Sequence, residues 1–175
     1  MREIEIKAHA LDMEKTKALI EQSCKEGRVV SKKDTYLRRD DGLMMRVRDN
    51  TGSLEATVKK RRKNEKGEED NLEYEISLGS TTLDDALLFF NNLGFDFYYN
   101  KYKDGWDWNL DGVHVELLNV NDLGWFLEME ALLDFDSSED EVNQKRELLS
   151  SFLKRFGVDE SQIEARSYRS MILKD

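Results

Sequence analysis

Charged and apolar residues alternate strictly at the start of the chain, in Glu3-Ile4-Glu5-Ile6-Lys7. Successive side chains of a β-strand point to opposite faces, so this segment predicts a strand with one charged and one apolar face. A single segment of this kind is typical of an ordinary solvated strand. The same pattern recurs along the chain, however, and its charged positions include Arg46, Arg48, Lys59, Glu73, Glu75, Lys101, Lys103, Glu116, Glu128 and Glu130.

Seven further segments have strand composition, and three segments repeat apolar residues every three or four positions as an amphipathic helix does. The strands are expected over 29–38, 43–48, 54–62, 71–78, 95–108, 113–118 and 126–132. The helices are expected over 12–27, with Asp12 as N-cap and Gly27 as stop signal, and over 83–94 and 138–157. Residues 161–173 could add a short last helix. Hairpin-like spacing favours antiparallel pairing in an α+β fold, and a closed or nearly closed barrel would leave no strand edges.

The three amphipathic helices indicate which face of the sheet is inside. They need an apolar surface to cover, so we expect them outside the barrel, with the charged faces lining its lumen. A cavity that gathers cationic and anionic side chains is costly unless a charged ligand fills it. A polyphosphate with a divalent metal would do so, because cations neutralise phosphate oxygens and carboxylates hold the metal.

Composition narrows the class of protein further. The net charge of −10 argues against nucleic-acid binding, which rests on basic residues. The single cysteine, Cys24, excludes a cysteine-rich zinc site, and two histidines leave little for a histidine-based one, so a hard cation is expected. We expect a structural hydrogen bond from His114 and wall packing from Trp106 and Trp108. With no proline-rich linker, membrane-spanning run or signal peptide, the sequence predicts a single domain over 1–175 in the cytoplasm, without membrane contact.

Short motifs follow one another in a specific order. They are Glu3-x-Glu5-x-Lys7, Asp34-x-Tyr36, Gly42 with Arg46-x-Arg48, Lys59, Glu73-x-Glu75, Leu123-Gly124 with Phe126-x-Glu128-x-Glu130, and Ser167-Tyr168. In these motifs the chain resembles the CYTH superfamily of triphosphate tunnel metalloenzymes, which includes class IV adenylyl cyclases and thiamine triphosphatases. Three positions depart from the family pattern, namely Asn71, Lys103 and Leu118, which stand where an arginine, an arginine and an aspartate are expected. Glu116, on the same strand face as Leu118, could replace the missing carboxylate.

The resemblance implies an eight-stranded antiparallel closed β-barrel, or tunnel, with helices outside. It implies Mg²⁺ or Mn²⁺ as cofactor, with metal ligands Glu3, Glu5, Glu116, Glu128 and Glu130. The triphosphate would be bound by Lys7, Arg46, Arg48, Lys59, Lys101 and Lys103. The catalytic residues would be Lys7, Glu73 and Glu75.

The activity favoured on this resemblance is an adenylyl cyclase that converts ATP to cyclic AMP and pyrophosphate. The chain length and the aromatic residues Tyr102, Trp106 and Trp108 favour a nucleotide over bare triphosphate. The alternatives are a triphosphatase acting on an inorganic or organic triphosphate, such as tripolyphosphate or thiamine triphosphate, and an inactive nucleotide- or polyphosphate-binding module. The resemblance also suggests a homodimer.

Overall fold

The computed structural model describes residues 2–24, 27–50, 52–63, 69–134 and 136–174, without the side chains of residues 2–3, 59–63 and 69–73. Its strands are β1 (Arg2–His9), β2 (Arg28–Arg38), β3 (Met44–Asn50), β4 (Ser53–Lys63), β5 (Glu69–Gly79), β6 (Asp96–Leu110), β7 (Val113–Val120) and β8 (Trp125–Leu133). Its helices are α1 (Met13–Glu21), α2 (Leu83–Asn92), α3 (Glu139–Arg155), the 3₁₀ turn η1 (Glu160–Gln162) and α4 (Tyr168–Leu173).

The strands form one sheet in the order β1-β8-β7-β6-β2-β3-β4-β5. The six strand pairings whose register is described are all antiparallel. The predicted α+β fold with eight antiparallel strands is therefore confirmed. Closure of the sheet into a barrel stays a prediction, because no pairing between β1 and β5 is found among the described residues. The chain divides into two compact units, residues 1–30 with 103–175 and residues 31–102.

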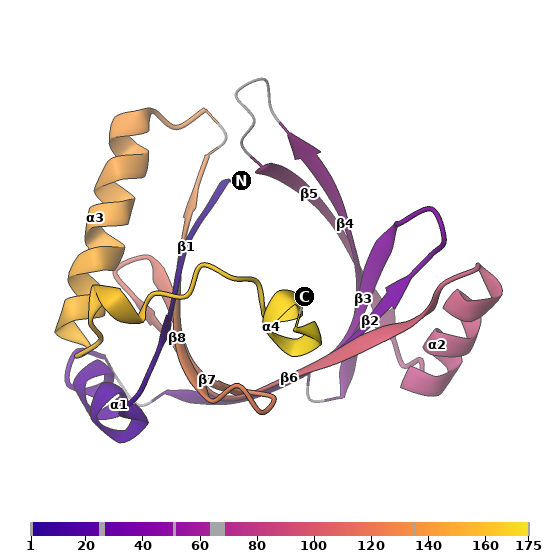
Figure 1. Ribbon diagram of the computed structural model, residues 1–175, viewed down its shortest axis with the longest axis horizontal. Coiled ribbons are helices and arrows are strands. Elements are labelled where there is room, and N and C mark those ends of the chain that lie inside the picture. Colours follow the sequence, from indigo (N-terminus) through magenta and orange to yellow (C-terminus); the bar gives the residue numbers. More distant parts are fainter. Residues whose placement is uncertain (1, 25–26, 51, 64–68, 135, 175) are drawn as a thin grey trace. The chain divides into compact units, whose positions relative to one another are not determined.

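In the first unit, α3 covers the apolar face of the sheet and runs alongside β1 (Figure 1). Its period of three to four residues puts Val142, Leu149 and Phe152 on one buried stripe. That stripe joins a core with the odd-numbered residues of β7, including Val113 and Val115. The charged residues of these strands are thereby left on the opposite face, as the alternation predicts.

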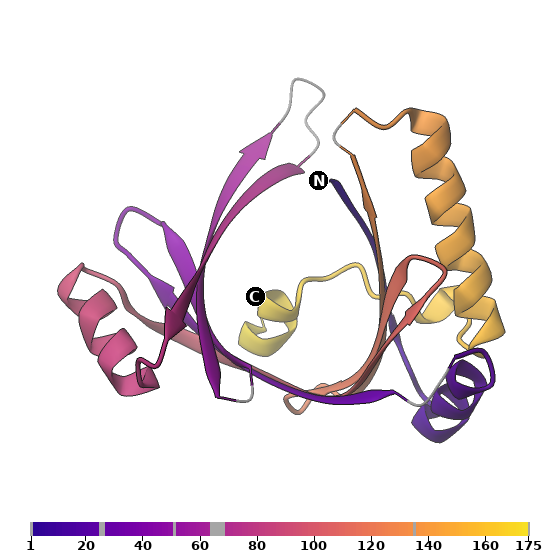
Figure 2. The ribbon, with the colours of Figure 1, turned by 180° about the vertical axis from the view of Figure 1, so that it is seen from behind.

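In the second unit, α2 packs on β3 (Figure 2). The helix begins after the N-cap Thr82, and its buried residues Ala86 and Phe90 meet Met45 and Val47 of β3. Arg46 and Arg48 alternate with those two apolar residues and so lie on the other face of β3.

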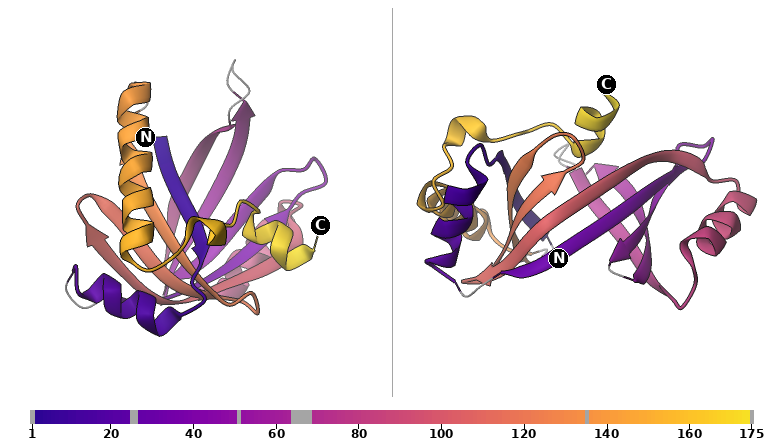
Figure 3. Two further views of the ribbon diagram at one scale, coloured as in Figure 1. Left: turned by 60° about the vertical axis from the view of Figure 1, so that its left-hand side comes forward. Right: turned by 90° about the horizontal axis from the view of Figure 1, so that it is seen from below.

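The C-terminal segment crosses β1 before it reaches α4 (Figure 3, left). A bridge joins Ala8 to Ile163, and the amide of Glu164 donates to the carbonyl of Lys7 at 2.8 Å. The predicted last helix over 161–173 is only partly right, because Ile163 and Glu164 bond to β1 and the chain bends at Arg166 before α4 begins. None of the helices among the described residues has an apolar stretch long enough to cross a bilayer.

The expected first helix is shorter than the sequence suggests. It ends at Glu21, with Gln22 as C-cap, so Gly27 is not its stop signal. A Cβ atom at Gly27 would lie 2.5 Å from the Trp108 indole. Gly27 therefore serves close approach of the backbone to a buried aromatic ring.

Candidate functional site

Two cross-strand rows of polar side chains occupy the charged face of the first unit. Facing residues of an antiparallel pair have their Cβ atoms about 5 Å apart, so each row places its side chains in contact range. The first row consists of Glu5, Glu130 and His114, and the second of Lys7, Glu128, Glu116 and Asp107. The rows combine β1, β8, β7 and β6, and strand register alone sets their order.

A pocket of about 20 Å³ opens between these rows and is lined by Glu5, His114, Glu116, Glu128 and Glu130. Its volume suffices for one water molecule or one ion. Carboxylate oxygens are the preferred ligands of hard divalent cations. The donor set therefore fits a divalent metal, and four of the five predicted metal ligands line this pocket. The fifth, Glu3, has its side chain outside the described part of the chain.

Glu128 is held from two sides. The Lys103 Nζ atom donates to both carboxylate oxygens, at 2.8 and 2.7 Å, and the Tyr168 hydroxyl donates to one of them at 2.5 Å. Lys103 also lies over the Tyr168 ring, 4.8 Å from its centroid. Burial and the negative charge of Glu128 raise the pKa of Tyr168 well above its usual range, so this phenol stays a donor. Lys103, predicted to bind phosphate, here neutralises a predicted metal ligand.

Lys7 contacts the C-terminal segment. Its ammonium group donates to the backbone carbonyl of Arg166 and lies 4.4 Å from the Tyr168 ring centroid. Burial lowers the pKa of Lys7, and the opposing charges of Glu5 and Glu128 do not fully offset this effect.

Leu118 lies on the same strand face as Glu116 but in different surroundings. It is fully buried in an apolar cluster with Phe126, Tyr168 and Met171. A carboxylate at position 118 would be buried among these groups at a large desolvation cost. Glu116, one step along the same face, pairs in register with Glu128 and Asp107 instead. The Glu116 carboxylate thus lies two residues along β7 from Leu118, the position at which the family pattern has an aspartate.

In the second unit, the charged face is centred on Asp34, whose side chain is fully buried. Arg48 donates to both of its oxygens, at 2.6 and 2.9 Å, and the Lys101 ammonium lies 3.1 Å away. Burial alone would raise the pKa of Asp34. The hydrogen bonds from Arg48 and the charge of Lys101 outweigh burial and lower that pKa below its usual range. Lys101 also donates to the Tyr36 hydroxyl at 3.0 Å.

Arg46 is less completely satisfied. Its Nη2 atom donates to Thr57 at 3.0 Å and lies 3.7 Å from Glu75. Its Nε atom is buried and has no hydrogen-bond acceptor among the described residues. An unsatisfied buried guanidinium donor is costly, so this geometry is suited to an anionic ligand.

Two other predicted residues, Lys59 and Glu73, pair across β4 and β5 in the backbone register, but their side chains lie outside the described part. The sequence reasoning did not include Asp107, which is buried and faces Glu116. It shares a strand face with Lys103 and Gly105 of β6, and this two-residue spacing is the signal that could have found it.

The predicted wall packing of two tryptophans agrees with their surroundings. Trp108 is buried in the core beneath the helices, and Trp106 stacks on Trp125 with ring centroids 5.7 Å apart. Tyr102 is partly exposed. Neither indole lies on the face that carries the carboxylate pocket, because Trp106 and Trp108 flank Asp107 along β6 and so point to the opposite face, where they pair with Leu117 and Val115 of the core.

A carboxylate-lined pocket in the first unit, and the arginine and lysine side chains of the second, define an α+β protein suited to a metal and to an anionic ligand. The chain belongs to the CYTH domain family, whose profile matches residues 1–168. This family includes adenylyl cyclases and triphosphatases that use divalent metals and bind triphosphate substrates.

Solved structures share this fold. A conserved hypothetical protein from Pyrococcus furiosus is 25% identical, with a TM-score of 0.75 over 95% of this chain and 98% of that protein. A candidate adenylate cyclase from Vibrio parahaemolyticus is 19% identical, with a TM-score of 0.77 over 98% and 97%. HpAC1 from Hippeastrum, a candidate adenylyl cyclase with a dominant triphosphatase activity, is 14% identical, with a TM-score of 0.64 over 98% and 94%. No curated protein matches the sequence significantly.

Proposed function

We propose that this chain is a divalent-metal-dependent enzyme that acts on a triphosphate. The observation that carries the proposal is the pocket lined by Glu5, Glu116, Glu128 and Glu130, a ligand set suited to Mg²⁺ or Mn²⁺. Glu3 is included among the proposed ligands because of its place in the Glu3-x-Glu5-x-Lys7 motif. A bound divalent cation would supply neutralisation of phosphate oxygens during phosphoryl transfer.

The phosphate groups are proposed to bind the cationic side chains Lys7, Arg46, Arg48, Lys59, Lys101 and Lys103. The buried Nε atom of Arg46 supports this part, because a phosphate oxygen would be the acceptor that it lacks among the described residues. Closure of the sheet into a single-domain tunnel, with Lys7, Glu73 and Glu75 as catalytic residues, belongs to the same proposal.

The first reaction that we propose is the conversion of ATP to cyclic AMP. The ribose 3′-oxygen forms a bond to the α-phosphorus, and the bond from that phosphorus to the bridging oxygen breaks. Pyrophosphate leaves with the electron pair, and the hydroxyl proton passes to a carboxylate or to water. The candidate adenylate cyclase from Vibrio parahaemolyticus, which shares the fold, supports testing this reaction first.

A specific observation favours hydrolysis of the triphosphate as the second candidate function. Trp108 packs in the core, and Trp106 packs against Trp125. Two of the three aromatic residues that favoured a nucleotide are therefore not placed to bind its base. The dominant triphosphatase activity of HpAC1 points the same way. In hydrolysis, water attacks the terminal phosphorus, and the rest of the substrate acts only as leaving group. An inactive binding module is the remaining alternative.

Product analysis separates these functions. Purified protein is incubated with Mn²⁺ and either ATP or inorganic tripolyphosphate, and the products are resolved by chromatography. Cyclic AMP with pyrophosphate supports the cyclase, whereas orthophosphate without cyclic AMP supports the triphosphatase. Binding without turnover of either compound supports the inactive module. Turnover that persists in excess chelator would contradict the metal-dependent enzyme altogether.

A further inference from the structure

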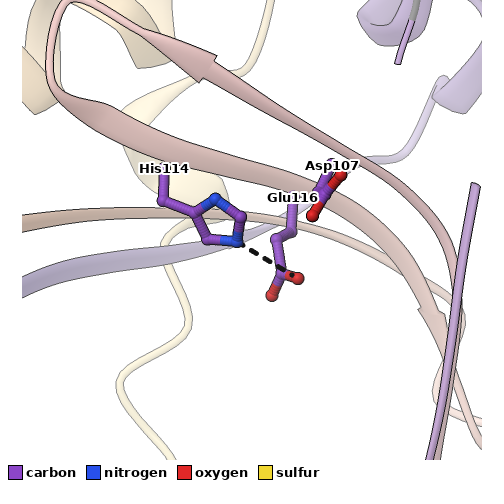
Figure 4. Close-up of side chains that lie close together, drawn as sticks. All are labelled: Asp107, His114 and Glu116. Carbon is purple, nitrogen blue, oxygen red and sulfur yellow. Dashed lines mark ion pairs between the residues drawn. The ribbon is translucent and has the colours of Figure 1, made fainter. Parts of the chain in front are cut away.

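Three side chains of the β6–β7 hairpin converge beside the carboxylate pocket, and one of them is a histidine (Figure 4). Asp107, His114 and Glu116 each offer one ligand atom, and these atoms all lie within 4.8 Å of one another. The His114 Nε2 atom lies 3.4 Å from a Glu116 oxygen. First-row divalent metals bind nitrogen and oxygen ligands at about 2.0–2.2 Å, so ligands around one ion are at most about 4.4 Å apart. Small side-chain rotations would bring all three atoms into that range.

The strand register fixes the place of His114 in this arrangement. His114 faces Glu130 across β7 and β8, and Glu130 faces Glu5 across β8 and β1. The imidazole therefore lines the same pocket as the carboxylates. Two separate observations, the convergence of ligand atoms and the pocket lining, thus include His114 among the groups around one ion-sized space.

Asp107 contributes differently from the other two residues. Both of its oxygens accept hydrogen bonds from Arg28, with the Nε contact at 3.0 Å. Its carboxylate is buried, whereas the Arg28 side chain is 76% exposed. A carboxylate keeps further lone pairs when an arginine binds it, so Asp107 can complete the site or orient its neighbours.

We propose that His114 is a metal ligand, together with Glu116, and that this nitrogen makes the site prefer a transition-metal cation such as Mn²⁺ over Mg²⁺. The physical reason is that Mg²⁺ takes oxygen ligands almost exclusively, whereas imidazole nitrogen suits first-row transition metals. The inference deepens the proposed function, because it names the class of metal that this site selects. Binding of the metal itself requires no catalysis, and the two ideas can therefore fail separately.

The test uses the full-length protein without nucleotide. Mn²⁺ is titrated in, its binding is followed by electron paramagnetic resonance, and electron spin echo modulation reports whether a nitrogen is bound to the ion. We expect a nitrogen signal in the native protein and its loss in His114→Asn. Mn²⁺ affinity should fall at least about tenfold in this variant, while Mg²⁺ affinity measured by competition changes less than about twofold.

The matched control is His9→Asn. His9 lies on β1 and contacts Glu164 at 3.2 Å, so its replacement should leave the nitrogen signal intact. Thermal unfolding of both variants checks that they fold, and Glu116→Gln is a second variant that should weaken Mn²⁺ binding. A native protein without nitrogen coupling, or a signal that survives in His114→Asn, would overturn the inference. Nitrogen-coupled Mn²⁺ binding without triphosphate turnover would support it and remove the proposed enzymatic function.

Discussion

At the scale of single residues, two buried carboxylates have different neighbours. Asp34 is surrounded by Arg48 and Lys101, which satisfy its charge. Glu116 instead lies opposite other carboxylates, Glu128 and Asp107, and close to His114. A carboxylate among cations stabilises the fold, whereas a carboxylate among carboxylates is suited to a bound cation.

The ion pairs of Asp34 with Arg48 and Lys101 predict that the stability of the protein depends on pH. Its folded-state pKa is lowered, so its contribution is fully present above the unfolded value of about 3.9 and is lost as the pH falls toward the folded value. Asp34→Asn should lower the free energy of unfolding at pH 7 by about 3 kcal/mol, because it leaves two cations uncompensated. Urea unfolding at pH 7 and pH 3 should show a smaller difference from the native protein at pH 3. Asp40→Asn, at an exposed position, serves as control. An equal loss of unfolding free energy in Asp34→Asn at both pH values would refute the stabilising role of the Asp34 ion pairs.

Glu116 predicts an effect on metal binding. Glu116→Ala removes a carboxylate from the pocket and should weaken Mn²⁺ binding by about 10–100-fold, as loss of groups at metal sites commonly does. Calorimetric titration of Mn²⁺ into the protein measures this change. Asp104→Ala, an exposed carboxylate on β6, is the control for net charge. An unchanged titration curve would assign Glu116 to a structural pair with His114.

At the scale of elements, the β6–β7 hairpin sets the geometry of the candidate metal ligands. Its two turn residues, Asp111 and Gly112, both have positive φ values, of 50° and 75°. Two consecutive residues of this kind form the tight turn that matches strand twist, and such a turn fixes the pairing register. The register then places Asp107 opposite Glu116.

A close approach within the same hairpin gives a prediction about stability. A Cβ atom at Gly105 would lie 2.0 Å from the Leu117 carbonyl oxygen on the neighbouring strand. Backbone atoms cannot yield without shifting β7, so Gly105→Ala should destabilise the protein by about 1–3 kcal/mol. Thermal or urea unfolding measures this loss, with the exposed Asn109→Ala on the same strand as control. Equal stability of the two variants would show that the hairpin accommodates a methyl group.

At the scale of the whole molecule, the two units differ in the charges that they gather. The first unit gathers carboxylates around a pocket, and the second unit gathers arginine and lysine around Asp34. The chain as a whole carries a net charge of −10. A triphosphate would add further negative charge, and a divalent cation would compensate part of it. Metal and triphosphate are therefore expected to bind in a mutually dependent way.

Glu5 tests whether the carboxylate pocket is needed for turnover, without disturbing the fold. Its side chain lines the pocket and is largely exposed, so Glu5→Ala should change the free energy of unfolding by no more than about 0.5 kcal/mol. Metal-dependent turnover of the triphosphate should be abolished. Glu14→Ala, an exposed carboxylate in α1, should retain full turnover. Activity and thermal unfolding are measured on the same preparations, and an active Glu5→Ala enzyme would exclude Glu5 as a metal ligand.

The sequence by itself determined which residues share a face, because alternation along a strand and the helical period are local properties of the backbone. The charged face, the antiparallel strands and the helices on the apolar face were therefore predictable from segments such as Glu3–Lys7 and the α3 stripe. Gly27 shows the limit of local signals, because the ring that it accommodates, Trp108, is remote in sequence.

Only the tertiary structure decided which charged groups meet. Lys103 binds Glu128, and Lys7 contacts the backbone of Arg166, which is 159 residues away in sequence. Asp107 faces Glu116 because the hairpin turn fixes its register. Alternation assigns a face but not a partner, since the partner depends on register between strands and on where distant segments pack.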